Sequence, residues 1–263
     1  MCDLNIERAG PRGNPRGGPT LVLIHPMGAD IRFWDACRRD WEERFDCLAV
    51  DLPAAGTSPD PGGTLTLRRQ AEILQSTLAK QDLKQIVPVG CAVGAMIAVE
   101  LAALLQESAS GLVLANPGLA TGREARAALS ARAAAVRSGG MAAVMPDAVA
   151  LAFDGQPHDE SFQAYAERFA AQDPVRYARQ IEGMLDADIT QALSTVRCPS
   201  FVVVGGHDRL LPPEIGRTVA SKLGDCTFAE YREAAHFIPW QASQRFSRDV
   251  EAWIGSAVLT DRD

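Results

Sequence analysis

Short apolar segments alternate with longer amphipathic segments along most of the chain. Residues 20–25, 47–52 and 85–90 are nearly continuous apolar runs, and each predicts a buried β-strand. Between them, residues 31–45 and 65–83 carry apolar side chains at helical spacing, so each predicts an amphipathic helix. This alternation predicts a mostly parallel central sheet with helices on both of its faces.

The same alternation resumes toward the end of the chain. The remaining predicted elements are strands over 111–116, 199–206 and 227–232 and helices over 94–106, 213–223 and 244–258. Pro88 is unfavourable inside its predicted strand, because proline lacks the N–H that a residue of a central strand donates to the neighbouring strand. Proline prefers edge strands or bulges, and the strand over 85–90 is still predicted here.

Residues 118–195 interrupt this pattern. The stretch is rich in alanine and arginine, as in REARAALSARAAAVRSGGMAAVM, and it contains helical patterns without a convincing strand. We expect a helical lid, inserted into a core that consists of residues 1–117 and 196–263. The alternative is a set of helices packed on the edge of the sheet with no part in binding.

Composition narrows the possible functions. A chain of 263 residues, 47% of them hydrophobic, is long enough for one large α/β domain. A net charge of −7 and the absence of long basic runs argue against a nucleic-acid partner. No apolar run reaches the roughly 18 residues of a membrane span, and the N-terminal residues lack the apolar core of a signal peptide. We expect a soluble, cytoplasmic protein that acts on a small molecule, and its oligomeric state stays open.

The cysteines and histidines do not form recognisable metal or disulfide patterns. The six cysteines show no CxxC spacing and often lie in or beside apolar segments, which indicates reduced thiols. The four histidines form no HxxxH pair. We therefore expect neither a metal nor another cofactor.

The sequence PVGCAVGAM, residues 88–96, has the spacing of a hydrolase nucleophile elbow. This tight turn between a strand and a helix needs small residues two before, two after and three after the nucleophile. A nucleophile at position 92 would have Gly90, Gly94 and Ala95 at these places. The residue there is Ala92, however, which cannot form an acyl intermediate. A nucleophile at Cys91 would place valine at two of the three positions, so Cys91 is interpreted as a core residue.

An acidic residue and a histidine follow in the order that such a site needs. Asp208 lies just beyond one predicted strand, and His236 lies beyond the next. The chain order of position 92, then Asp208, then His236 is the order of nucleophile, acid and histidine in α/β hydrolases. Asp208 is expected to orient His236, which is expected to act as the general base.

Two backbone N–H groups are candidates for the oxyanion hole. One is that of Val93, the residue after the nucleophile position, and the other comes from the loop after the first central strand. In that loop Pro26 has no N–H, so Met27 is the expected donor. The alternative is that the loop only ends the strand.

These motifs together resemble the α/β-hydrolase superfamily over residues 19–254. Residues 51–58, DLPAAGTS, are similar to the DLPGHGxS loop of that superfamily, and residues 28–35, GADIRFWD, are similar to the GxDxRxWD stretch of 3-oxoadipate enol-lactonases. The chain departs from the pattern at Ala92, at His25-Pro26 where HG is usual, and in a lid without the tryptophans of enol-lactonases.

The resemblance implies a hydrolase of a small ester or lactone, such as a carboxylated intermediate of aromatic degradation. A serine at position 92 would attack the substrate, and His236 would transfer the proton. Candidate substrate-binding residues are Arg32, Phe237 and a lid arginine: Arg123, Arg126 or Arg132. The arginines would bind a substrate carboxylate; otherwise they are solvated surface charges.

Several alternatives stay open at this stage. Alanine at position 92 is explained either by a serine-to-alanine change made to trap a substrate, or by a natural protein that has alanine at this position. The latter would bind a ligand, or use His236 with a water or a substrate proton. Rival activities on the same scaffold are the hydrolysis of an amide and of a carbon–carbon bond.

Overall fold

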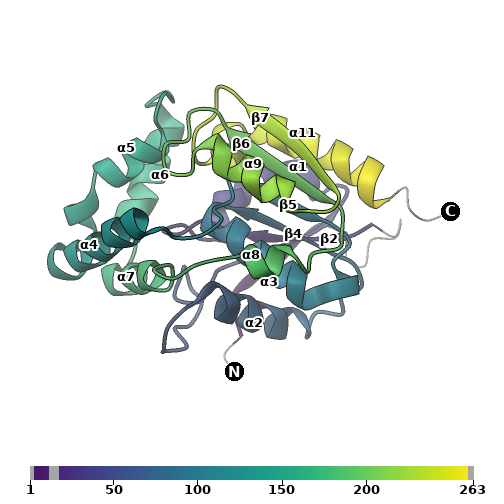
Figure 1. Cartoon of the computed structure of the whole chain (residues 1–263), viewed down its shortest axis with the longest axis horizontal. Helices are drawn as coiled ribbons and strands as arrows, with labels where there is room; N and C mark the ends of the chain where they lie inside the picture. Colours follow the sequence, from purple (N-terminus) through teal and green to yellow (C-terminus); the bar gives the residue numbers. More distant parts are fainter. Residues whose placement is uncertain (1–2, 12–17, 260–263) are drawn as a thin grey trace.

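A seven-stranded sheet forms the centre of the molecule (Figure 1) in the computed structural model, which describes residues 3–11 and 18–259. The strand order is β1-β3-β2-β4-β5-β6-β7. The strands are β1 (Ile6–Ala9), β2 (Thr20–Ile24), β3 (Asp46–Val50), β4 (Ile86–Cys91), β5 (Leu112–Ala115), β6 (Ser200–Gly205) and β7 (Cys226–Tyr231). All neighbours run parallel except β1, which pairs antiparallel with β3.

Helices cover both faces of this sheet, which confirms the predicted architecture. On one face, Leu21 and Leu23 of β2 join a core with α1 (Asp35–Trp41) and α11 (Ser243–Trp253). On the other, Val22 and Ile24 pack with the remaining core helices. Those helices are α2 (Leu67–Leu78), α3 (Val93–Leu105), α8 (Thr190–Leu193) and α9 (Pro213–Ser221). Every residue from β2 through β6 that lies in a strand is buried, as expected for strands covered on both faces.

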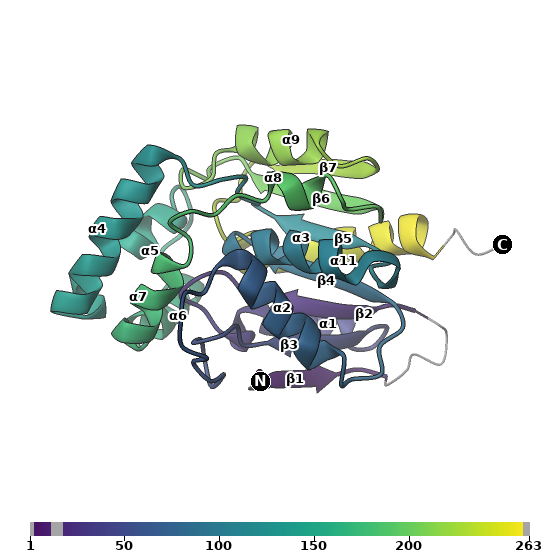
Figure 2. The same cartoon turned by 60° about the horizontal axis from the view of Figure 1, so that its bottom comes forward.

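Between β5 and β6 the chain leaves the sheet and forms a group of helices. These are α4 (Arg123–Gly139), α5 (Asp147–Ala152), α6 (Glu160–Ala170) and α7 (Pro174–Glu182), here called the inserted helices. Figure 2 shows them gathered at one end of the sheet, where α4 and α7 pack against each other. The short helix α8 follows them in sequence but packs against α3.

Short elements complete the fold. They are α10 (Ile238–Gln241), the 3-10 helices η1 (Ile31–Trp34), η2 (Gln106–Ser108) and η3 (Met141–Val144), and the π-helical turn η4 (Ile254–Val258). The helix expected over residues 31–45 is thus split into η1 and α1 and ends at Trp41. Within residues 3–11 and 18–259, no helix is both long enough and apolar enough to cross a membrane.

Pro88 lies in β4, which is a central strand. Two residues earlier, the carbonyl of Ile86 accepts from Ser110 N on the β5 side, so the N–H that Pro88 lacks would also face β5. The ladder between β4 and β5 begins only at Val89. Pro88 therefore falls in a gap between that ladder and the isolated Ile86–Ala109 bridge, where it costs no ladder bond.

Candidate active site

Ala92 lies at the turn from β4 into α3 with φ 52° and ψ −115°. This backbone conformation is unfavourable for an L-residue, and it is the strained turn that a nucleophile elbow requires. A Cβ added to Gly90 would lie 2.2 Å from the carbonyl oxygen of Gly94, and one added to Gly94 would lie 2.2 Å from that of Ile24. Both positions therefore need glycine, because strand and helix backbones approach too closely for a side chain.

Asp208 and His236 meet at the ends of β6 and β7. The Nδ1 atom of His236 lies 2.8 Å from Oδ2 of Asp208, and both residues are buried. The other carboxylate oxygen of Asp208 accepts the N–H groups of Leu210 and Leu211, each at 2.9 Å. A fixed carboxylate that accepts Nδ1–H leaves the lone pair on Nε2 free to accept a proton. The two residues were predicted as the acid and the base, and the structure brings them together.

Met27 and Val93 line the same cavity as His236. Val93 is the first residue of α3, so its N–H has no acceptor within the helix. Met27 follows β2, which is the neighbour of β4 in the sheet. Because parallel strands end at the same edge, both residues lie near Ala92, and their N–H groups are the candidates for an oxyanion hole.

Asn116 supports the histidine loop, a role that the sequence did not reveal. Its Nδ2 atom donates to the carbonyl oxygens of Ala235 at 2.7 Å and His236 at 2.8 Å, and its Oδ1 accepts from Gly205 N at 2.7 Å. This side chain ties the ends of β5 and β6 to the loop that carries His236. A polar residue at the end of a buried apolar strand is the only signal in the sequence.

His25 is a structural histidine. It is fully buried, its Nδ1 donates to the carbonyl of Pro26 at 2.8 Å, and its Nε2 accepts from Leu52 N at 3.0 Å. Burial lowers the pKa of His25, so the ring stays neutral and keeps this pair of hydrogen bonds. His25 therefore ties the start of the loop that carries Met27 to the residues that follow β3.

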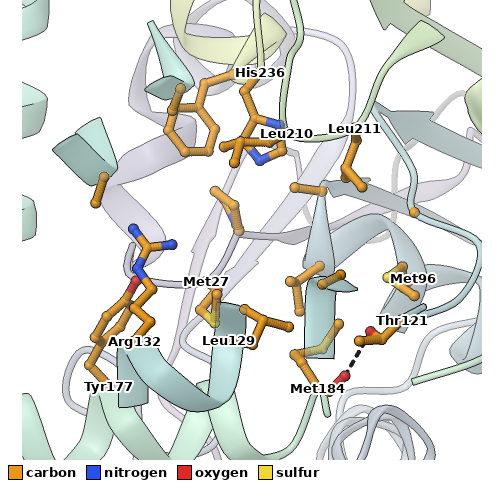
Figure 3. A pocket seen from close by; sticks show the side chains of 18 of the residues that line it. Met27, Met96, Thr121, Leu129, Arg132, Tyr177, Met184, Leu210, Leu211 and His236 are labelled. Atoms are coloured by element: carbon orange, nitrogen blue, oxygen red, sulfur yellow. Dashed lines mark hydrogen bonds between the residues drawn. The ribbon is translucent and has the colours of Figure 1, made fainter. Parts of the chain in front are cut away.

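A cavity of about 190 Å³ opens over Ala92 and His236, between the sheet and the inserted helices (Figure 3). Most of its lining is apolar, including Met96, Leu129, Phe169, Met184, Leu211 and Phe237. Phe237, which was predicted to bind substrate, lies in the wall of this cavity. Such a lining suits a small and largely apolar molecule.

The candidate arginines lie in different places. Arg132 on α4 lines the cavity, whereas Arg123 and Arg126 do not. Arg32 is absent from the lining too: its Nε donates to Asp30 at 2.9 Å, and its side chain is 54% exposed. The structure thus does not bring Arg32 to the site, because an aspartate two residues earlier holds its guanidinium elsewhere.

Cys91 points away from the cavity and is completely buried, with Sγ against the carbonyl oxygen of His236 at 3.7 Å. Burial raises the pKa of its thiol well above the ordinary value. We expect iodoacetamide to alkylate Cys91 at least about 100-fold more slowly in the native protein than in urea-unfolded protein. Peptide mass spectrometry over time measures both rates, and equal rates would show that Cys91 is an accessible thiolate.

The part of the chain that the structure describes contains no group of three or more histidine, cysteine, aspartate or glutamate side chains arranged to hold a metal ion. Five of the six cysteines lie in this part and are free thiols. Cys2 lies outside the described residues.

Solved structures share this fold. An esterase from Thermogutta terrifontis, described as malate bound, superposes with a TM-score of 0.88 at 22% identity, covering 97% of this chain and 94% of the other. The enol-lactonase from Burkholderia xenovorans LB400 also gives a TM-score of 0.88, at 21% identity and 96% coverage of each chain.

The sequence comparisons agree with the fold. A putative carbamate hydrolase, RutD, of Klebsiella pneumoniae is 24% identical over 231 residues, which are 84% of this chain and 85% of the relative. The model of the alpha/beta hydrolase family matches residues 21–249. With a strained elbow, an Asp–His pair and a cavity at the strand ends, this chain belongs to the alpha/beta hydrolase family.

Proposed function

We propose that the cavity binds a small ester or lactone at a hydrolytic site that lacks only its nucleophile. The observation that carries this proposal is Ala92 in the strained backbone of an elbow, next to the buried Asp208–His236 pair. A serine hydroxyl at residue 92 would attack the substrate carbonyl while His236 Nε2 took its proton. Asp208 would hold the imidazole, and the N–H groups of Met27 and Val93 would stabilise the oxyanion.

The methyl group of Ala92 excludes this covalent route in the present chain. Removing the nucleophile from a serine triad lowers turnover by about 10⁶-fold, and the oxyanion hole and binding alone retain roughly 10³- to 10⁴-fold acceleration over water. His236 can still take a proton from a water molecule, since Nε2 keeps its lone pair. We therefore propose a protein that binds such a substrate and cleaves it only slowly.

The position of the inserted helices supports the proposal that they form a lid over the cavity. Leu129 of α4, Phe169 of α6 and Met184 after α7 contribute to the cavity wall opposite the sheet. In that position they exclude water from the carbonyl and set the size of the molecule that fits. The proposed lid is therefore the part of the chain that selects the substrate.

The comparisons support acyl substrates in general. The relatives described as putative carbamate hydrolases, and the structural neighbours described as an esterase and an enol-lactonase, all bear names that imply cleavage at a carbonyl carbon. Amide hydrolysis and carbon–carbon cleavage would use the same elbow and oxyanion hole. The apolar lining, with few hydrogen-bonding groups for a leaving amine, favours an ester or lactone.

Phenyl acetate binding tests this proposal on the chain as it stands. We expect saturable binding in equilibrium dialysis and recovery of most of the ester uncleaved. Leu129→Trp fills the cavity and should weaken binding at least about tenfold. The matched control is Leu151→Trp on α5, because Leu151 is 42% exposed and absent from the lining. Rapid cleavage by the present chain, or equal binding by both variants, would contradict the proposal.

A further inference from the structure

Arg132 is the one permanently charged side chain in the lining of the cavity, as far as the described residues show. The lining contains no aspartate and no glutamate, and its other ionisable cation is His236. The lining therefore carries one fixed positive charge and no carboxylate, in a protein whose net charge is −7. A guanidinium in a largely apolar wall attracts an anion.

The guanidinium of Arg132 has no carboxylate partner within the described part of the chain. Two other arginines of α4 do form ion pairs. Arg126 pairs with Asp186, and Arg137 pairs with Glu182 of α7. Arg132 instead lies over the ring of Tyr177, with Cζ 5.9 Å from the ring centroid. It is half-buried and lines the cavity, so its guanidinium donors are available to a ligand there.

A second polar group in this lining also lacks a partner. The hydroxyl of Tyr165, on α6, is buried and forms no hydrogen bond with any described residue. Burial raises the pKa of Tyr165 well above the ordinary value, so the hydroxyl keeps its proton and stays a donor. Burying a donor without an acceptor costs free energy, and a bound carboxylate would remove that cost.

Arg132 and His236 lie on different sides of one cavity. Figure 3 shows Arg132 beside Tyr177 on one side of the cavity and His236 on the opposite side. We infer that Arg132 is an anion-binding residue, and that it selects ligands in which a short apolar segment separates a carboxylate from the reactive carbonyl. This inference rests on the proposed function, since it takes the carbonyl to lie at Ala92.

Benzoate and its neutral analogue benzamide test the inference by binding alone. We expect isothermal titration calorimetry to show that the present chain prefers benzoate by about 10- to 100-fold. Arg132→Met should reduce this preference to less than about twofold, and Arg132→Lys should retain part of it. The control is Arg126→Met, six residues earlier on α4, where the side chain pairs with Asp186 away from the cavity.

The pH of the titration separates Arg132 from His236. A guanidinium is charged at about pH 6 and at about pH 9, so a preference that comes from Arg132 should persist at both. A preference that disappears at the higher pH, or one that survives Arg132→Met, would overturn the inference. Equal binding of benzoate and benzamide would overturn it too, but would leave the cavity as a binding site. Failure of phenyl acetate, benzoate and benzamide alike would instead overturn the proposed function, and this inference with it.

Discussion

Replacing Ala92 with serine is expected to raise the rate of p-nitrophenyl acetate hydrolysis by at least about 10³-fold. The elbow backbone already has the required conformation, and His236 is already held by Asp208 at 2.8 Å. Under the proposed function, the substitution therefore adds one hydroxyl oxygen to a site that already holds its general base, His236, and its oxyanion donors. This expected gain is smaller than the loss of about 10⁶-fold that follows removal of the serine from an evolved triad. The difference arises because the cavity contacts are not optimised for this ester.

Two variants control for this gain. In the Ala92→Ser background, His236→Gln should return hydrolysis to about the level of the parent chain, because members of a triad act as a unit. Cys91→Ser in the parent should produce no gain, since residue 91 points into the core. Comparing phenyl acetate with acetanilide in the serine variant then distinguishes ester from amide hydrolysis. A serine variant no faster than the parent would show that the elbow does not present residue 92 to the substrate.

Gly94→Ala is expected to lower the free energy of unfolding by about 3 kcal/mol. The added Cβ would lie 2.2 Å from the carbonyl oxygen of Ile24 and 2.6 Å from that of His25. Both contacts are with backbone in the strand next to β4, so no flexible side chain can move aside. Relief requires α3 to shift away from the sheet, which would also displace the elbow.

Urea unfolding of Gly94→Ala measures this loss of stability, and Gly224→Ala is the matched control. Gly224 has no atom within 4 Å of its added Cβ and no positive φ, so its substitution should change stability by less than about 0.5 kcal/mol. The two variants share the same chemical change, which leaves packing as the difference between them. Similar midpoints would mean that strand and helix do not pass as closely as the structure places them.

The elbow and the Asp–His pair were predictable because their positions follow from local rules. Small residues around position 92 predict a tight turn. Polar residues that directly follow buried strands lie at the same edge of a parallel sheet. Asp208 and His236 both follow that rule, so their proximity could be predicted without knowing how the inserted helices pack. β1 was missed because its four residues, IERA, are only partly buried and carry no clear alternation.

The residues that line the cavity were harder to predict. Arg123, Arg126 and Arg132 share one helix, and only the packing of α4 against α7 decides which of them faces the cavity. Arg32 has the right residue type in a motif resembling that of enol-lactonases, but Asp30 binds it. Tertiary contacts between distant segments set these outcomes, and periodicity along the chain does not encode them.

Covalent labelling with a fluorophosphonate tests the central claim most directly, because the reagent reacts with a serine that an elbow, a general base and an oxyanion hole activate. We predict that the Ala92→Ser variant takes up one label per chain and that peptide mass spectrometry locates it on residue 92. The parent chain and the Ala92→Ser, His236→Gln double variant should stay unlabelled at that residue. An unlabelled Ala92→Ser variant that is correctly folded would contradict the claim that this site lacks only its nucleophile.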